Sequence, residues 1–166
     1  APNMAWLAFA LMVIGAVTNN VAVYQGGSSV MMTSYVPMMA APSFYLGLIL
    51  FAVGALIGCF VFLGTLVVAK RDKTYQGSVP LVTFGAITAC IIAVFTIASG
   101  AIILIPTFLM SVGIVKEVDP LVYRTIWWAF GHSSQQINVA AHISIWYAVA
   151  AIAFGAKPMS ERVSRG

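Results

Sequence analysis

The sequence predicts an all-α membrane protein, a bundle of four transmembrane helices with both chain ends on the cytoplasmic side. Three observations carry this prediction: 61% of the 166 residues are apolar, only 7% are charged, and the charges lie in short breaks between long apolar runs. A soluble domain of about 150 residues buries only about 70% of the surface that its unfolded chain exposes, so it cannot hide this much apolar surface. Soluble enzymes, disordered tails, disulfide scaffolds and nucleic-acid binders are therefore excluded.

Four apolar stretches are long enough to cross a bilayer as helices, which takes about 20 residues each. A proline near the end of the third stretch, Pro106, predicts a kink there, because proline cannot donate the backbone hydrogen bond of a helix. We treat residues 1–166 as a single transmembrane domain. The predicted spans run from Met4 to Val23, from Phe44 to Ala69, from Val79 to Met110 and from Val122 to Phe154.

The orientation of the spans follows from lysine and arginine, which are in excess in cytoplasmic loops. The break after the first span, residues 24–43, carries no charge. Its apolar patches, residues 30–32 and 37–39, are expected to lie on the membrane surface or under a partner. Six of the eight basic residues lie in the break after the second span and in the tail, which places both termini in the cytoplasm: Lys70, Arg71, Lys73, Lys157, Arg162 and Arg165.

Polar side chains concentrate in the fourth span, which contains both histidines of the chain, His132 and His142. Because polar groups inside a membrane are costly, they are functional candidates by default. On a helical wheel His132, Gln136 and Tyr147 share one stripe. A histidine and an amide one turn apart can hold a metal and orient a bound ligand or water, whereas hydrogen bonding between helices is the structural alternative. His142 lies about 15 Å of helical rise from His132, so a metal site here needs further donors from elsewhere.

The segment from Val118 to His132 resembles the start of the sixth helix of subunit I in haem–copper oxidoreductases, the B-type oxygen reductases in particular. Upstream, residues 35–47 are similar to that family's Tyr-x-Pro…Phe-Tyr-Leu-Gly start of the fourth helix, and residues 5–15 are similar to its third helix. The resemblance therefore covers helices three to six of a subunit that normally has twelve or more. The matching parts of the first segment are Asp119-Pro120-Leu121, Arg124-Thr125, Trp127-Trp128 and Gly131-His132.

The resemblance implies roles for three residues. His132 corresponds to a ligand of the non-haem metal, copper or iron, beside the high-spin haem, and Tyr147 to a phenol on the proton route from the inner face. Oxygen reductases carry a tyrosine four residues after this histidine and usually a proline directly after it, where this sequence has Gln136 and Ser133. Nitric-oxide reductases of the same superfamily lack the tyrosine, so Gln136 favours NO over O2 as the substrate. Gln136 and Tyr147 are thus the candidate catalytic residues, and His132 is the candidate metal ligand.

The other haem and metal histidines of the family lie on helices outside this sequence. We therefore expect a partial or split subunit I of a respiratory terminal reductase, an enzyme only together with a partner chain that supplies the haems. The alternative is a non-catalytic structural subunit of a larger respiratory or oxidoreductase complex. A small transporter is disfavoured because no acidic or basic residue lies in the middle of a span. The expected partners are other membrane subunits and the lipid bilayer, without nucleic acid, in a prokaryotic cytoplasmic membrane.

Overall fold

The computed structural model describes residues 2–30 and 33–165, and the regular structure in this part of the chain is entirely helical. Each of its four long helices is long and apolar enough to cross a membrane. The predicted all-α bundle with four spans is therefore confirmed, while the side of the membrane on which the termini lie stays a prediction. The helices are α1 (Pro2–Tyr24), α2 (Pro42–Arg71), α3 (Leu81–Ser111), α4 (Pro120–Phe154) and the single turn α5 (Glu161–Ser164).

Prolines explain why α2, α3 and α4 start at different residues from those predicted. Helices α2 and α4 start two residues earlier than predicted, because Pro42 and Pro120 occupy the first turn, where a missing N–H costs nothing. Helix α3 starts two residues later than predicted, at Leu81, because a proline disfavours helical backbone in the residue before it and Pro80 itself is extended, with a ψ of 149°. The same helix continues through Pro106 to its end at Ser111.

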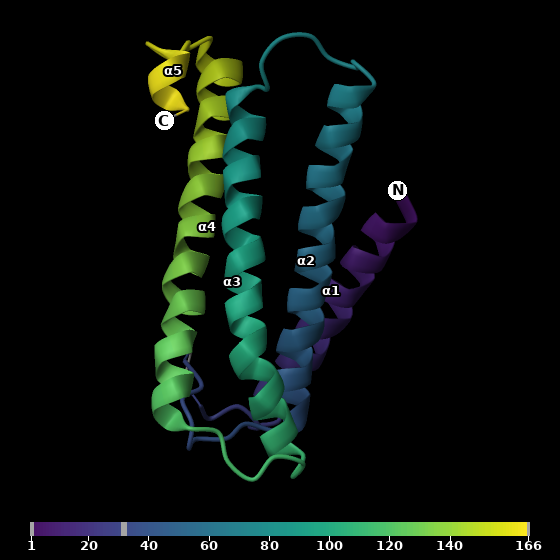
Figure 1. Ribbon diagram of the computed structural model, residues 1–166, viewed down its shortest axis with the longest axis vertical. Helices are drawn as coiled ribbons and strands as arrows, with labels where there is room; N and C mark the ends of the chain where they lie inside the picture. Colours follow the sequence, from purple (N-terminus) through teal and green to yellow (C-terminus); the bar gives the residue numbers. More distant parts are fainter. Residues whose placement is uncertain (1, 31–32, 166) are drawn as a thin grey trace.

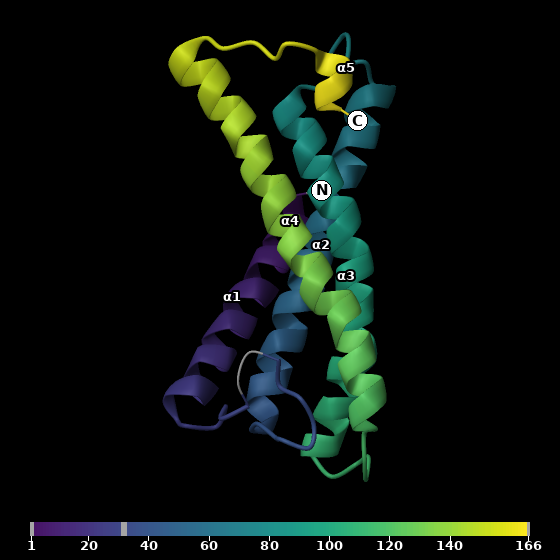
Figure 2. The same cartoon turned by 90° about the vertical axis from the view of Figure 1, so that its left-hand side faces the viewer.

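The long helices form two antiparallel pairs, α1 with α2 and α3 with α4, and the pairs meet where α2 packs on α3 (Figure 1). Seen from the side, α4 lies close to α3 near its start and diverges from it toward its C-terminal end (Figure 2). The loop between α2 and α3 and the tail with α5 lie at one end of the bundle. The loop before α2 and the loop before α4 lie at the other end.

Glycines bring the backbones of α1 and α2 into direct contact. A Cβ atom added at Gly15 would lie 2.5 Å from the backbone nitrogen of Phe51 and 2.6 Å from the carbonyl oxygen of Gly47, closer than real Cβ atoms come. Small residues allow this close approach, which maximises van der Waals packing where lipid offers no hydrophobic driving force between helices. Close backbone-to-backbone packing therefore holds α1 against α2.

The loop before α2 packs against the start of α4. The ring of Tyr35 contacts the rings of Tyr123 and Trp127 edge-on, with centroids 6.2 and 6.0 Å apart. The hydroxyl of Tyr123 donates a hydrogen bond to the backbone oxygen of Thr33 at 3.3 Å. Contacts between residues far apart in the sequence therefore hold the loop before α2 against α4 at this end of the bundle.

One expectation for this loop is wrong. Val30, which we placed on the membrane surface or under a partner, is fully buried in the chain's own core together with Tyr45 and Tyr123. The physical reason is that the loop folds inward over the helix ends, so Val30 finds an apolar site within the chain. Residues 31–32 of the same patch lie outside the described residues, whereas Met38 and Met39 of the second patch are exposed.

Candidate functional site

Helix α4 packs against the rest of the chain with one face and leaves the opposite face open. Its buried residues are Tyr123, Trp127, Gly131 and Ser144, and the hydroxyl of Ser144 donates a hydrogen bond to the backbone oxygen of Val82 in α3. The exposed face contains His132, Gln136, Val139 and Ile143. His132 and Gln136 of the predicted stripe therefore point away from the chain's own bundle.

His132 and Gln136 lie together on this open face. Their Nε2 atoms are 3.5 Å apart, one helical turn from each other, and both side chains are exposed. Among the described residues this is the one hydrogen-bonding contact of the imidazole. An amide nitrogen only donates, so Nε2 of the ring accepts here and the neutral ring carries its proton on Nδ1. Nδ1 can bind a metal when the amide is turned so that its oxygen accepts from an N–H at Nε2. A ring nitrogen with a lone pair, oriented through the second nitrogen, is how histidine usually binds a metal.

The structure does not bring Tyr147 to this pair. Tyr147 lies fifteen residues after His132, which is about 22 Å of helical rise. Its half-buried side chain instead lines a cavity between α3, α4 and the tail. Tyr147 and His132 are thus two separate candidate positions on one helix.

The described residues do not form a complete metal site. They contain no group of three or more histidine, cysteine, aspartate or glutamate side chains that could hold a metal ion. His142, the second histidine, is exposed on a neighbouring strip of α4, ten residues beyond His132. The chain therefore fits a metal or haem centre only as the donor of one ligand, and the remaining donors must come from outside the described residues.

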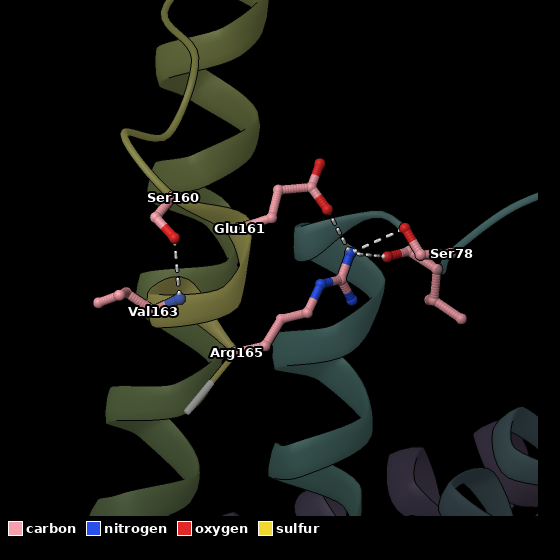
Figure 3. Close-up of polar contacts among 6 residues, drawn as sticks. Ser78, Ser160, Glu161, Val163 and Arg165 are labelled. Atoms are coloured by element: carbon pink, nitrogen blue, oxygen red, sulfur yellow. Dashed lines mark hydrogen bonds and ion pairs between the residues drawn. The ribbon is translucent and has the colours of Figure 1, made fainter.

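The structure shows a second polar cluster that the sequence reasoning missed (Figure 3). The guanidinium of Arg165 donates to the backbone oxygen of Val79 at 2.6 Å and to the hydroxyl of Ser78 at 3.3 Å, and it pairs with Glu161 at 3.1 Å. The hydroxyl of Ser160 caps α5, accepting from the N–H of Val163. A serine followed by an acidic residue is a local sign of a helix start, but no local signal indicates the contact with residues 78–79.

The fold and the site together describe a membrane-spanning helix bundle in which one span, α4, turns both of its histidines, His132 and His142, outward. The sequence matches the family described as cytochrome c and quinol oxidase polypeptide I over residues 1–166, and the chain belongs to this family. Cytochrome c oxidase subunit 1 of Thermus thermophilus is 29% identical over 170 residues, which cover 99% of this chain and 30% of that protein. A chain of a heme-copper terminal oxidase dimer solved by cryo-electron microscopy is similar with a TM-score of 0.80 and 30% identity.

The chain spans under a third of the length of these relatives. The structural match covers 87% of this chain but only 25% of the heme-copper oxidase chain. The chain is therefore an integral membrane segment of a haem–copper oxidase subunit I, as the resemblance implied. Subunits of this family work with haem and copper within multi-subunit membrane complexes.

Proposed function

We propose that this chain provides His132 as one ligand of the non-haem metal in a respiratory terminal reductase of a prokaryotic cytoplasmic membrane. The observation that carries the proposal is the exposed imidazole on the open face of α4, within a helix able to cross the membrane. A polar group left facing lipid finds no water to bind, so this face needs a covering partner that satisfies it. Other helices of the same complex would cover this face and would supply the further ligands of the metal.

Gln136 positions His132 in this proposal. With its amide turned so that the oxygen accepts from the N–H at Nε2, Gln136 would fix one ring orientation and leave the lone pair of Nδ1 for a bound metal. The metal and the haem, when bound, supply the redox chemistry. Tyr147, fifteen residues further along the helix, has a hydroxyl that can accept and donate a proton, and we assign it to proton uptake.

Gln136 also supports nitric oxide as the substrate. An amide has no proton that titrates at neutral pH and no readily oxidised group, so Gln136 cannot supply the proton and electron that a tyrosine would supply for splitting O2. Forming an N–N bond between two nitric oxide molecules needs no such donor. Turnover of the assembled complex with NO and with O2, each at matched concentration, tests this choice: faster O2 turnover would contradict it.

Metal analysis of two histidine variants tests the ligand role. In the assembled complex, His132→Ala should lose the non-haem metal and turnover while the haem spectrum is retained, because one donor of the site is missing. His142→Ala is the matched control, since it removes an exposed imidazole from the same helix, and it should keep the metal. Gln136→Ala should be milder, with a loss of about 10–100-fold in metal affinity or activity.

The second candidate function is that of a non-catalytic structural subunit. It is favoured by the incomplete donor set within the described residues. In that case His132→Ala would leave metal content and activity at the wild-type level. The variant would then lower stability by no more than a lost hydrogen bond, about 0.5–1.5 kcal/mol.

A further inference from the structure

A cavity of about 460 Å³ opens between the start of α3, the end of α4 and the tail. Its walls are mainly apolar and include Leu81 and Val82 of α3 and Ala148, Ala151 and Ile152 of α4. Its volume falls within the range of about 300–1,000 Å³ that is usual for sites that bind small molecules. The cavity is lined by the start of α3 and by residues of the tail. These segments lie at the same end of the bundle as the loop between α2 and α3 (Figure 1).

Fixed contacts on both sides build this cavity. On one side, α4 touches α3 at Ser144, where a Cβ atom added at Gly85 would lie 2.7 Å from the Ser144 Cβ. Beyond this contact, residues 145–154 diverge from α3, and the tail then crosses back toward it (Figure 2). The tail turns at Gly155, which has a φ of 62°, and is fastened by Arg165 to the start of α3 (Figure 3).

The rim of the cavity carries one uncompensated positive charge. Lys157 lines the cavity and is exposed, and within residues 2–30 and 33–165 it forms no ion pair. Glu161, also at the rim, is paired with Arg165 at 3.1 Å, so its negative charge is already balanced. The rim thus offers an ammonium group above an apolar interior.

We propose that this cavity binds one anionic phospholipid, with an acyl chain against the apolar walls and the phosphate on the ammonium of Lys157. The cavity lies at the end of two membrane-spanning helices, which is the level at which lipid headgroups lie. Basic residues at this level attract anionic lipids, and this end of the bundle carries Lys70, Lys73 and Arg162 in addition. A polypeptide helix would also cover the apolar walls, but it would make no use of the unpaired cation at the rim.

Lipid binding to the assembled, delipidated complex tests the proposal. Native mass spectrometry would compare phosphatidylglycerol and phosphatidylcholine that carry the same acyl chains. We expect wild type to prefer phosphatidylglycerol and Lys157→Gln to weaken that binding about fivefold, as expected for one basic residue at an anionic surface. Lys116→Gln, which removes an exposed lysine at the opposite end of the bundle, is the control and should change nothing.

A second variant tests the cavity itself. Ala151→Leu adds apolar volume to an exposed wall position, so the fold should tolerate it while the acyl chain is displaced. Loss of one bound phospholipid from both this variant and Lys157→Gln supports the proposal. Equal binding of the two lipids to wild type, or unchanged phosphatidylglycerol binding in both variants, overturns it. A cross-link from an introduced Ala151→Cys to another polypeptide of the complex also overturns it.

Discussion

Replacing Gly47 with alanine tests whether α1 and α2 are held together by backbone contact. The added Cβ atom would lie 2.7 Å from the backbone nitrogen of Asn19 and 2.8 Å from the carbonyl oxygen of Gly15. Both are backbone atoms of α1, so no side-chain rotation relieves the overlap. Ordinary contact begins at 3.4 Å, and the two helices must therefore separate locally by about 0.7 Å.

The expected loss of stability follows from two opposing contributions. Overpacking a well-packed interface costs roughly 1–3 kcal/mol. Alanine is a better helix former than glycine by about 1 kcal/mol, which offsets part of this cost. Gly58→Ala is the matched control, because Gly58 lies in the same helix and an added Cβ there meets nothing within 4 Å. We expect Gly47→Ala to be less stable than Gly58→Ala by about 1–3 kcal/mol.

Denaturation of the assembled complex in mixed micelles, with increasing sodium dodecyl sulfate, measures this difference. Helix content by circular dichroism gives the midpoint for wild type and both variants under one detergent condition. The midpoint of Gly47→Ala should lie below that of Gly58→Ala. Equal midpoints for the two variants would show that α1 and α2 do not approach as closely as the glycine contacts require.

Three further predictions concern topology, assembly and capping. With Cys59 and Cys90 replaced, a thiol introduced by Asp72→Cys should react with an impermeant maleimide only after permeabilisation, whereas Lys116→Cys should react in intact cells; the reverse pattern would invert the orientation. The isolated chain should aggregate in detergent, because the face with His132 and Gln136 lacks its partner, and a monodisperse stable monomer would argue against this. Asp119→Ala should destabilise by about 0.5–2 kcal/mol in the same denaturation assay, since the carboxylate accepts hydrogen bonds from two N–H groups of the first turn of α4, and Asp119→Asn should retain most of the stability.

The number and approximate extents of the spans could be predicted from the sequence because length and hydropathy are local properties. The helix starts at Pro42 and Pro120 follow from equally local chemistry, although the predicted bounds missed them by two residues. The sequence also indicated that His132 and Gln136 share a face, since residues four apart on a helix are neighbours. The family follows from residues that are contiguous in the chain, and the match covers all of it.

The tertiary structure decided which way that shared face points. It points outward because Ser144 and Tyr123, on the other side of α4, bind α3 and the loop before α2. The burial of Val30 and the anchoring of Arg165 on residues 78–79 arise in the same way. Each of these contacts joins residues far apart in the chain, and its formation depends on the shape of both partners at once. A pattern within one segment carries no information about its partner, so the sequence by itself determined the helices and the family, and the packing determined which side chains face outward.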